Sequence, residues 1–421
     1  MARPLPQPAR IYQVGGVVRD ELLGRPNADR DYVVVGVTPE TMLASGFRPV
    51  GRDFPVFLHP DTNEEYALAR TERKHGRGYR GFEFFASPDV TLEEDLARRD
   101  LTINAMARGE DGLLVDPHGG RADLAAGLLR HVSTAFVEDP LRVLRVARFA
   151  ARLGFAVAPE TEALMRAIVT SGELATLAPE RIWQELATGL SEAQPSRMLA
   201  VLRACGALAQ LLPEVDALFG VPEAPEQCGT IDSGVHVARA LDWSADHGHA
   251  LPARYGILTH DLGLAAVPRD AWPVQQAHER QSVHLAERVS ERLKVPLDCG
   301  DAARLAARWH RSVHRAAELR PAKLLELLYA TDALRRPARL DTLLDVCAAV
   351  ACSQPGAPQD YPRASVLHGA LVVVKTVDAG AIARNVAKPK GKQNDEGIAK
   401  AVRAARLKAL RAWRRTTVMK A

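Results

Sequence analysis

The sequence predicts an α+β protein, with a mixed head of strands and helices followed by an all-α body. Three observations lead to this fold class. Residues 10–37 contain a strand, a glycine turn, a helix, an acidic turn and a second strand. Further strand-like segments follow at 54–59, 65–69 and 82–85, and from about residue 91 the apolar residues recur with helical periodicity. Strands gathered in one part of a chain and helices in another are typical of α+β folds.

The head elements are predicted from local sequence. Residues 11–14 are apolar and β-prone, and Gly15 and Gly16 interrupt them. Residues 17–23 favour a helix that Gly24 closes, because glycine is common just past a helix C-terminus. Residues 31–35, DYVVV, form an apolar β-branched run that is typical of a buried strand.

The body is predicted to consist of helices joined by short breaks. Helical periodicity covers residues 140–152, 160–170, 180–190, 196–211, 236–248, 278–293 and 301–318. Proline-rich breaks near 213–226 and 354–362 mark candidate boundaries. A chain of 421 residues is too long for one ordinary core, so its length predicts two to four domains, and we divide it into four. Their expected bounds are 1–137, 138–225, 226–345 and 346–421.

Composition favours a globular protein of a reducing compartment. No apolar run reaches the ~18 residues that span a bilayer, and residues 1–14 contain no apolar signal region. Five cysteines without a CxxC pair indicate reduced core thiols. We therefore predict a cytoplasmic location without a membrane partner. The sequence leaves a monomer and a homodimer open.

A glycine turn in the head is suited to binding an anion. The segment GGVVRD, residues 15–20, follows a strand and opens a helix. Gly15 and Gly16 let backbone N–H groups approach a triphosphate, the helix N-terminus faces the anion, and Arg19 adds a cationic fork. Alone this motif is weak, because most glycine turns of this kind are only turns.

Asp29 and Asp31 are candidate metal ligands and catalytic residues. Residues i and i+2 of a strand point to the same side, so both carboxylates can hold hard cations. Two Mg²⁺ ions held there could activate a 3′-hydroxyl and stabilise the departing pyrophosphate. A single DxD is common on protein surfaces. Its place after a glycine turn and before a buried strand strengthens the catalytic interpretation.

Two arginine-rich segments follow the strands of the head. RRDLTINAM, residues 98–106, places paired arginines before a helix start, where they could hold a triphosphate. In residues 138–148, EDPLRVLRVAR, the charged positions recur every three residues: Asp139, Arg142, Arg145 and Arg148. Three arginines on one helix stripe repel one another, so they need an anionic partner or water. The alternative to a ligand site is a solvated basic face.

In this order, these motifs resemble those of class II tRNA nucleotidyltransferases and bacterial poly(A) polymerases. The shared motifs are GGxVRD, DxD, RRDxTINAM and EDxxRxxRxAR. Residues 50–59 and 65–74 resemble bacterial CCA-adding enzymes with an HD domain, and the resemblance covers about residues 10–365. It implies a polymerase-β-like nucleotidyltransferase head at 1–137, a helical neck and body at 138–225, an all-α HD phosphohydrolase domain at 226–345 and a helical basic tail at 346–421.

The resemblance implies a role for each candidate residue. ATP or CTP would be bound by Gly15, Gly16, Arg19, Arg99, Arg145 and Arg148. Asp29 and Asp31 would bind Mg²⁺, and Asp139 with Arg142 would serve as an amino-acid template for the base. The implied reaction adds CCA to the 3′ end of tRNA from CTP and ATP, without a nucleic-acid template.

The template role also has a physical basis. A carboxylate can accept a hydrogen bond from the amine of cytosine or adenine while an arginine donates to the ring acceptor. Guanine and uracil present the reverse order of donors and acceptors. Because a mispaired polar group in a closed site is costly, one Asp–Arg pair can reject them strongly.

The second half contains a possible metal centre. The order His236, His260-Asp261, Asp332 matches the ligands of HD phosphohydrolases. Imidazole and carboxylate ligands suit Ni²⁺ or another transition metal, and also Mg²⁺. A bound water would then attack a phosphate ester, as a 2′,3′-cyclic phosphodiesterase, 2′-nucleotidase or phosphatase does. The alternative for each histidine is an ordinary core residue with its hydrogen bonds satisfied.

The HD-like segment departs from the pattern of its relatives. Residues 260–265, HDLGLA, lack the lysine of HDLGKG. Gln275 and Gln276 stand where the family has histidines, and Arg311 stands where an acid is common. We therefore expect the metal ligands to remain and hydrolase activity to be weak or absent.

The tail and the neck are the remaining candidates for RNA contact and support. Residues 381–421 hold twelve Lys/Arg and two acidic residues, a net charge of +10, while the other 380 residues sum to −6. This tail is a candidate contact for the tRNA phosphate backbone, and the alternative is a solvated helix face. PERIWQEL, residues 179–186, resembles the family's neck and is expected to hold the template helix in place.

Three other functions stay open at this point. A bacterial poly(A) polymerase shares the head motifs. An HD phosphohydrolase whose head only binds RNA, or a tRNA-binding chaperone, would need a catalytically dead head. The complete DxD and template residues argue against a dead head.

Overall fold

A computed structural model describes most of the chain. The described residues are 5, 8–26, 30–50, 56–74, 82–222, 232–269, 278–354, 356–358, 360–386 and 395–418. The chain forms two compact units, Met1–Leu211 and Leu212–Ala421. Each unit is described by itself.

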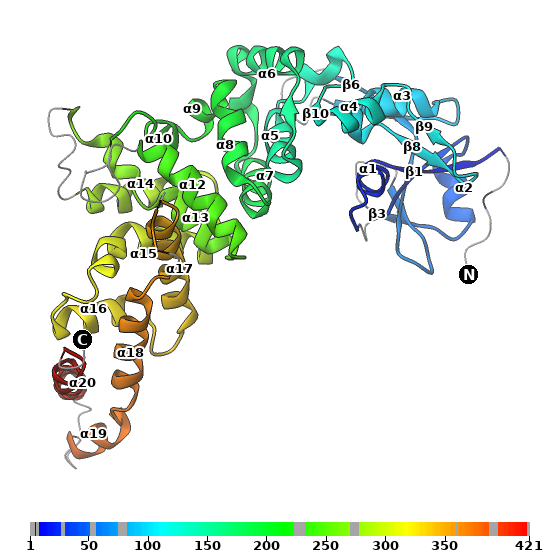
Figure 1. Cartoon of the computed structure of the whole chain (residues 1–421). Coiled ribbons are helices and arrows are strands. Elements are labelled where there is room, and N and C mark those ends of the chain that lie inside the picture. Colours follow the sequence, from blue (N-terminus) through cyan, green and yellow to red (C-terminus); the bar gives the residue numbers. More distant parts are fainter. Residues whose placement is uncertain are drawn as a thin grey trace. The chain divides into compact units, whose positions relative to one another are not determined.

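The first unit contains a seven-stranded mixed sheet (Figure 1). The strands of the unit are β1 (Arg10–Val14), β2 (Asp31–Val35), β3 (Arg48–Val50), β4 (Val56–Leu58), β5 (Glu65–Leu68), β6 (Arg70–Lys74), β7 (Phe82–Ala86), β8 (Ala107–Gly109), β9 (Leu114–Val115), β10 (Leu128–Leu129) and β11 (Ala156–Val157). The large sheet has the order β3-β4-β5-β2-β1-β8-β9. Within it only β2 and β5 run parallel. The pairs β6–β7 and β10–β11 form separate two-stranded sheets.

Both faces of the large sheet are covered. Successive side chains of a strand point to opposite faces. Val33 of β2 therefore packs on one face, in a cluster with residues of α3 (Leu92–Ala97). Val34 packs on the other face, in a cluster with Met42 of α2 (Pro39–Ala44). This double burial explains why DYVVV is a continuous apolar run instead of an alternating one.

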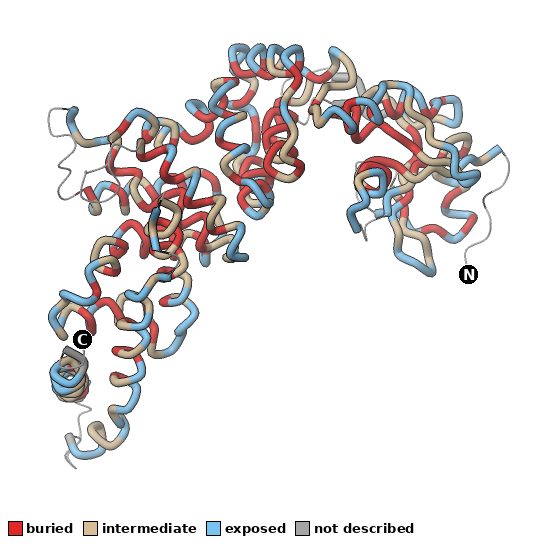
Figure 2. Tube along the Cα trace, in the orientation of Figure 1, coloured by how far each residue is buried: buried red, intermediate tan, exposed pale blue. Residues whose placement is uncertain are grey.

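Helices complete the first unit. They are α1 (Gly16–Leu22), α2, α3, α4 (Gly120–Ala126), α5 (Leu141–Leu153), α6 (Pro159–Ser171), α7 (Pro179–Ser191), α8 (Pro195–Ala204) and α9 (Ala207–Leu211), with 3-10 turns at Thr102–Asn104, Thr134–Glu138 and Glu173–Thr176. α5 packs against both α7 and α8 (Figure 1). Figure 2 shows that buried residues follow the facing sides of these helices. The helix that carries the predicted arginine stripe is thus a core helix.

The described residues of the second unit form helices and turns, with one isolated bridge between Pro222 and Asp232. The helices are α10 (Pro213–Asp216), α12 (Ser233–Asp246), α13 (Leu251–Thr259), α14 (Glu279–Arg292), α15 (Leu297–His314), α16 (Pro321–Ala330), α17 (Ala338–Cys352), α18 (Arg363–Lys375), α19 (Ala379–Val386) and α20 (Asp395–Val418), with a 3-10 turn at Leu262–Ala266. α13 and α15 pack together at its centre, against α17. α20 packs on α16, α18 and α19.

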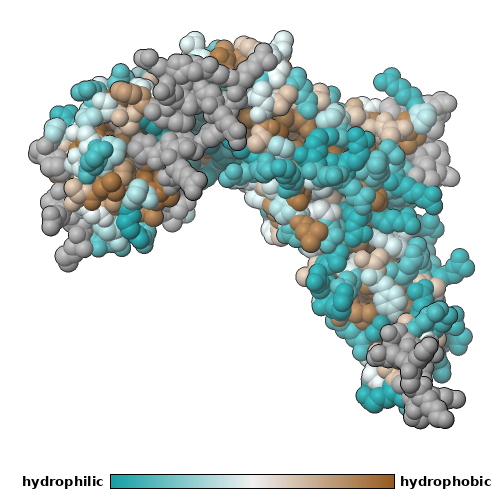
Figure 3. All heavy atoms as spheres, turned by 180° about the vertical axis from the view of Figure 1, so that it is seen from behind, coloured by the Kyte–Doolittle hydropathy of each residue, from teal (hydrophilic) through white to brown (hydrophobic). Residues whose placement is uncertain are grey.

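One described segment, Arg363–Asn385, is long and apolar enough by composition to cross a membrane. In the structure it is divided between α18 and α19, and Leu367, Ala370 and Val374 of α18 are buried. A single segment of this kind is weak evidence for a membrane protein, because core helices of other proteins pass the same test. On the face shown in Figure 3, hydrophilic side chains lie between small hydrophobic patches.

The α+β fold class is confirmed, and most predicted elements are present. The expected strands at 11–14, 31–35 and 65–69 correspond to β1, β2 and β5, and each predicted helical window contains a helix. The prediction that the chain becomes helical from about residue 91 is wrong for β8 and β9, which extend the head sheet. These strands have three and two residues, too few to show periodicity. The four-domain division stays a prediction.

Candidate active site

A pocket of about 530 Å³ lies in the first unit, and all eight predicted nucleotide-binding residues line it. Nine arginines and three aspartates dominate its wall. The lining residues are Gly15, Gly16, Arg19, Asp31, Arg70, Arg98, Arg99, Asp100, Asn104, Asp139, Leu141, Arg142, Arg145, Arg148, Phe149, Arg152 and Arg181. A cavity with this excess of guanidinium groups is suited to a polyanion.

The glycine turn stands at one wall of the pocket. Gly15 has φ +73°, a conformation that side-chain-bearing residues avoid, and a Cβ there would lie 3.1 Å from a guanidinium nitrogen of Arg99. Gly16 begins α1, so the helix N-terminus borders the pocket. Both glycines thus stand where an anion could approach the backbone N–H groups.

Arg19 is buried and already paired. Its Nε donates to Asp20 Oδ1 at 2.8 Å, and its NH1 donates to Asn104 Oδ1 at 2.6 Å. Burial lowers the pKa of Arg19, and the carboxylate of Asp20 opposes this shift. Arg19 still lines the pocket, so its fixed guanidinium is held in place by protein partners.

Of the two candidate catalytic carboxylates, the structure describes one. Asp31 is the first residue of β2, is exposed and lines the pocket. Asp29 lies outside the described residues. The predicted geometry of the pair therefore stays a prediction, while the place of Asp31 agrees with a role in the pocket.

The predicted stripe, which runs from Asp139 just before α5 to Arg148 within α5, lines the pocket. Asp139 Oδ1 accepts the backbone N–H of Leu141 at 3.0 Å, just before the helix begins. Arg142 is only 8% exposed. Its guanidinium donates to the backbone carbonyls of Arg98, at 2.5 Å, and Ala135, at 3.2 Å. Arg142 therefore ties α5 to the RRD segment. Its backbone N–H donates to the backbone carbonyl of Asp139 at 3.0 Å, whereas no side-chain hydrogen bond joins the two template candidates among the described residues.

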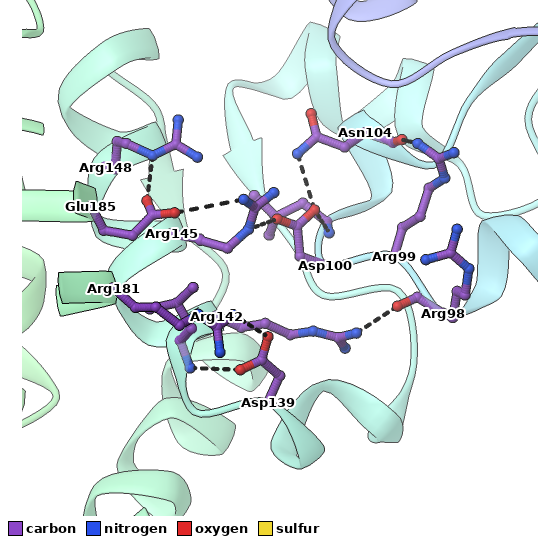
Figure 4. A network of polar contacts seen from close by, with 12 residues as sticks. Arg98, Arg99, Asp100, Asn104, Asp139, Arg142, Arg145, Arg148, Arg181 and Glu185 are labelled. Atoms are coloured by element: carbon purple, nitrogen blue, oxygen red, sulfur yellow. Dashed lines mark hydrogen bonds and ion pairs between the residues drawn. The ribbon is translucent and has the colours of Figure 1, made fainter. Parts of the chain in front are cut away.

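The two remaining arginines of the stripe have carboxylate partners (Figure 4). Arg145 Nε donates to Asp100 Oδ2 at 2.8 Å, and its NH1 lies 3.6 Å from Glu185 Oε1. Arg148 Nε donates to Glu185 Oε2 at 2.5 Å. The predicted need for an anionic partner is thus met inside the protein. The alternative of a fully solvated basic face does not fit α5.

Asp100 is the buried centre of this network. It accepts hydrogen bonds from Asn104 Nδ2 at 3.1 Å and from the backbone N–H of Leu101 at 2.8 Å, besides the bond from Arg145. Burial would raise its pKa, but the charge of Arg145 and the bond from Asn104 outweigh burial and lower it. The charge of Asp100 raises the pKa of Arg145 in turn. Both groups are therefore charged at neutral pH.

Asp95 of α3 is likewise a buried carboxylate that pairs with two arginines, Arg98 and Arg99. Arg98 donates to its Oδ1 at 2.6 Å, and Arg99 donates to its Oδ2 at 3.1 Å. Burial would raise the pKa of Asp95, but the two arginines together lower it. The orientation of Arg99 toward the pocket is thus fixed by a fully buried carboxylate.

Sequence reasoning assigned no role to Asp95 or Asp100, and it gave Arg181 and Glu185 only the general role of residues 179–186, which were expected to hold the template helix in place. Asp95, Asp100 and Glu185 each hold arginines that line the pocket. Charge balance could have predicted that such acids exist, because three arginines on a buried helix require carboxylates from other parts of the chain. Arg181 lies on α7, and its NH2 is 3.9 Å from Asp139 Oδ2.

A second polar cluster lies in the second unit, around Asp261. His278 Nε2 lies 2.9 Å from Asp261 Oδ1, and His310 Nε2 lies 3.3 Å from the same oxygen. His260 Nε2 lies 3.4 Å from Oδ2. Among the described residues, one ligand atom each from Asp261, His278 and His310 lie within 4.8 Å of one another, close enough to share a metal ion.

Of the four predicted HD ligands, only Asp261 belongs to this compact group, and His260 adjoins it. His236 is buried, and its Nε2 forms a 2.8 Å hydrogen bond with the carbonyl of Val350. Asp332 accepts two hydrogen bonds from Arg335 at 2.8 and 3.0 Å. Both side chains have these partners, so the described structure does not gather the four predicted ligands into one compact group, and the predicted ligand set stays a prediction. Gln275 and Gln276 lie outside the described residues.

The protonation of His310 fits a cation between it and Asp261. Burial lowers the pKa of His310 to about 4, so the ring is neutral at pH 7. Its Nδ1 is 2.9 Å from the carbonyl of Ala306, which can only accept, and therefore carries the ring proton. The lone pair of Nε2 then faces a carboxylate oxygen at 3.3 Å. A metal ion between these two acceptors would remove their repulsion.

Comparison with known families agrees with the geometry of the first unit. Residues 11–130 match the poly A polymerase head domain, and residues 154–219 match a probable RNA and SrmB-binding site of polymerase A. The chain is 60% identical over 378 residues to a multifunctional CCA protein of Dechloromonas aromatica, covering 89% of this chain and 91% of that protein. It is 57% identical over 409 residues to one of Burkholderia mallei, covering 95% and 98%.

Solved structures show the same fold. The CCA-adding enzyme of Bacillus stearothermophilus in complex with CTP superposes with a TM-score of 0.65 at 25% identity, covering 98% of this chain and 95% of that one. The Thermotoga maritima CCA-adding enzyme complexed with tRNA gives a TM-score of 0.60 at 21% identity, covering 96% and 87%, and supports the fold alone. The nucleotidyltransferase head is thus confirmed. The chain belongs to the family of bacterial multifunctional CCA proteins, the CCA-adding tRNA nucleotidyltransferases.

Proposed function

We propose that the arginine-lined pocket of this CCA-adding enzyme binds CTP and ATP in turn and joins them to the 3′ end of tRNA. The observation that carries the proposal is that the glycine turn, Asp31 and the stripe of α5 line one pocket. A cytoplasmic location, where tRNA and both nucleotides are available, is part of the proposal.

The triphosphate is assigned to the guanidinium side of the pocket. Arg99, Arg145 and Arg148 are each oriented by a carboxylate, so little side-chain freedom is lost when they bind phosphate oxygens. The turn at Gly15 and Gly16 offers backbone N–H groups to the same anion.

Asp29 and Asp31 are assigned to Mg²⁺, since enzymes of this class use a divalent metal and carboxylates suit a hard cation. When bound, Mg²⁺ supplies activation of the tRNA 3′-hydroxyl and charge compensation for pyrophosphate. The exposed Asp31 at the start of β2 is accessible from the pocket. Asp31→Asn should lower incorporation ~10³-fold or more, because several kcal/mol of transition-state stabilisation depend on the metal.

The base is assigned to Asp139 and Arg142. Asp139 keeps Oδ2 available beside Arg181, and it can accept a hydrogen bond from the amine of cytosine or adenine. Arg142 uses its two terminal nitrogens on backbone carbonyls, yet a guanidinium has five N–H groups, so donors remain for the ring acceptor.

Incubation with a tRNA that lacks its 3′ end tests the activity directly. With CTP and ATP, the product should grow by C, C and A and then stop. A long A tail would instead indicate a poly(A) polymerase. Absence of any incorporation would contradict both, and would favour a chaperone or a hydrolase with an RNA-binding head.

The template assignment has its own test. Asp139→Ala should lower the preference for CTP and ATP over GTP and UTP by ~10- to 100-fold, because one good bidentate contact is worth about 1–3 kcal/mol. Triphosphate affinity should change less. A variant that still adds only C and A with normal fidelity would show that the base is chosen elsewhere.

We also propose that Asp261, His278 and His310 hold a divalent transition metal. Nitrogen and carboxylate donors within 4.8 Å of one another suit Ni²⁺, Mn²⁺ or Zn²⁺. Arg311 lies at the edge of the cluster and pairs with Glu279 at 3.5 Å. An arginine in this position, together with the missing lysine of the HDLGKG motif, supports a metal site with little phosphohydrolase activity.

Calorimetric titration of the full chain with Ni²⁺ tests this second site. Asp261→Ala should abolish binding of the tightest ion, and His368→Ala should not, because His368 pairs with Asp341 on the exterior. Turnover of a 2′,3′-cyclic nucleotide should be weak. Robust turnover by the wild type that is lost in His260→Ala would overturn the weak-hydrolase part.

A further inference from the structure

Three buried carboxylates each bind two of the arginines that line the pocket of the first unit. The three groups are Asp95 with Arg98 and Arg99, Glu185 with Arg145 and Arg148, and Asp20 with Arg19 and Arg152. Figure 4 shows the second group, in which one carboxylate bonds both arginines. The third group contains Arg152, which lines the pocket but lies beyond the EDxxRxxRxAR motif and has no assigned role.

Asp20 bonds Arg19 and Arg152 with different oxygens. Its Oδ1 accepts a hydrogen bond from Nε of Arg19 at 2.8 Å, and its Oδ2 accepts one from NH2 of Arg152 at 2.9 Å. Asp20 is fully buried, whereas the side chain of Arg152 is 36% exposed and lines the pocket. A guanidinium has five N–H groups, so the bond to Asp20 leaves donors for a ligand. Arg152 is therefore oriented by a buried carboxylate and accessible from the pocket.

Arg152 lies at the end of α5 that is farthest from the residue assigned to the base. An α-helix rises 1.5 Å per residue, so about 15 Å along the helix axis separates Arg142 from Arg152. Arg145 and Arg148, which are assigned to the triphosphate, lie between them, and all four arginines line the pocket. Arg152 follows Arg148 by four residues, so these two share one face of the helix. A nucleotide with its base at Arg142 therefore points its terminal phosphate toward Arg152.

The charges of Arg19 and Arg152 repel each other. Burial lowers the pKa of Arg19, and the charge of Arg152 lowers it further, while Asp20 opposes both. Asp20 does not line the pocket, and neither does Glu192, another acid near Arg152. A phosphate oxygen in the pocket would face both guanidinium groups from the open side and relieve their repulsion. The pair is thus suited to a phosphate group.

We propose that Arg152 is a further nucleotide-binding residue, which binds the terminal phosphate of CTP and ATP and then the departing pyrophosphate. The inference rests on the proposed binding of both nucleotides in this pocket. In the reaction, the tRNA 3′-oxygen loses its proton to solvent and bonds the α-phosphorus, and the bond from that phosphorus to the oxygen bridging to the β-phosphate breaks. The β- and γ-phosphates leave together, so Arg152 stays in contact with the leaving group and takes no part in the choice of base.

Calorimetric titration of the full chain with CMP, CDP and CTP, in Mg²⁺ and without tRNA, tests this role. Arg152→Gln should bind CTP about 10-fold more weakly, because a hydrogen bond between charged groups is lost, and should bind CMP as the wild type does. The ratio of CTP to CDP affinity should fall most. Arg25→Gln is the matched control, because NH1 of Arg25 lies 3.4 Å from the carbonyl of Arg152 but Arg25 does not line the pocket. It should leave all three affinities unchanged.

Two further measurements separate phosphate binding from a structural role. Arg152→Lys keeps a charge beside Asp20 but loses the planar fork, so it should lower the ratio of CTP to CDP affinity less than Arg152→Gln does. Pyrophosphate should inhibit Arg152→Gln about 10-fold more weakly than the wild type. The preference for CTP and ATP over GTP and UTP should not change, and a lowered preference would place Arg152 at the base and overturn the inference.

The affinities of the three nucleotides decide between the remaining outcomes. Equal weakening of CMP, CDP and CTP in Arg152→Gln means that the lost link to Asp20 loosens the whole pocket, and it overturns the inference. Unchanged affinities also overturn it, and they leave the triphosphate assignment standing if the wild type binds CTP more tightly than CMP. A wild type that binds all three equally contradicts the triphosphate assignment itself.

Discussion

Asp100 connects two motifs that are far apart in the sequence. It is 7% exposed, and it holds Arg145 from a position 45 residues away. Its pKa is lowered, because the charge of Arg145 and the bond from Asn104 outweigh its burial. A lowered folded pKa means that the carboxylate contributes stability above its unfolded pKa of about 3.9, and that this contribution disappears as the pH falls through the folded value.

Replacement of Asp100 by Asn should therefore destabilise the first unit at neutral pH. Breaking a buried pair costs about 3–5 kcal/mol, and the partial exposure of Arg145 reduces this to about 2–3 kcal/mol. Urea unfolding at pH 7 would measure the loss. The difference from the wild type should shrink as the pH falls below about 4, because the unfolded chain then binds a proton at Asp100 while the folded protein keeps this carboxylate ionised. A pH-independent difference would mean that the loss comes from packing instead of charge.

For single residues, the sequence predicted which side chains line the pocket better than it predicted which acids pair with them. The glycine turn and the stripe on α5 are local patterns, and they line the pocket as expected. The acids that orient them are not local: Glu185 lies 37 residues from Arg148. Nothing in one sequence says which of many acids folds back onto a given arginine. The same limit explains why His278 and His310 were not chosen as the neighbours of Asp261.

Among the elements, α4 is fitted closely to the RRD segment. A Cβ on Gly120, at the start of α4, would lie 2.2 Å from the carbonyl oxygen of Thr102. That backbone leads to Asn104, which bonds both Arg19 and Asp100. The close approach of α4 therefore fixes the backbone that carries Asn104, a residue that lines the pocket.

Gly120→Ala should disturb the pocket as well as the fold. The clash involves backbone, which cannot rotate away, and overpacking of this kind costs about 1–3 kcal/mol. We expect a lower melting temperature and a higher KM for both CTP and ATP. Gly300→Ala in α15 is the control, because its Cβ would meet no atom closer than 3.8 Å. If Gly120→Ala shows the stability and KM of the wild type, the contact between α4 and the backbone of Thr102 does not constrain the pocket.

Long elements were predictable, and short ones were not. The 13-residue helices α5 and α7 carry enough turns to show their periodicity. β8 and β9 have three and two residues, and only their pairing with β1 and with each other makes them strands. The strand conformation of β8 and β9 is therefore determined by tertiary contacts and not by local sequence preference.

In the whole molecule, the basic residues of α20 fall into two groups: some bind neighbouring helices, and others are exposed to solvent. Leu410 is buried, and Arg406 NH1 donates to the hydroxyl of Tyr329 at 3.1 Å. Arg414 donates to the carbonyl of Ala316 at 3.4 Å. Lys408 and Arg411 are exposed, as is Arg415. The inner charges anchor the helix on its neighbours, and the outer ones are the candidates for RNA phosphate.

Replacing Lys408, Arg411 and Arg415 by Gln should weaken tRNA binding without unfolding the tail. Each lost phosphate contact lowers the slope of log K against log salt by about 0.7–0.9. Truncation after about residue 380 should flatten the same slope, but it also uncovers apolar surface, so the melting temperature must be compared. An unchanged slope in the triple variant would identify the outer charges as a solvated helix face.

The functional residues were easier to predict from the sequence in the first unit than in the second. The motifs of the first unit occur in a fixed order with fixed spacing, which is why they led to the family and the chemistry. The HD-like ligands of the second unit were inferred from order alone, and His236 and Asp332 do not join the compact group around Asp261. Dipeptides and single histidines carry too little spacing information to select a metal site.

The polar links around the pocket that we propose to bind nucleotides have a consequence for how the chain acquires its activity. Arg152 bonds Asp20 across 132 residues, and Arg19 bonds Asn104 across 85. Such links close long loops, whose entropy must be lost before the contacts form. The pocket should consequently be among the last features to appear as the polypeptide collapses. During synthesis on the ribosome, the nascent chain should stay unable to capture CTP or ATP until α7 has emerged.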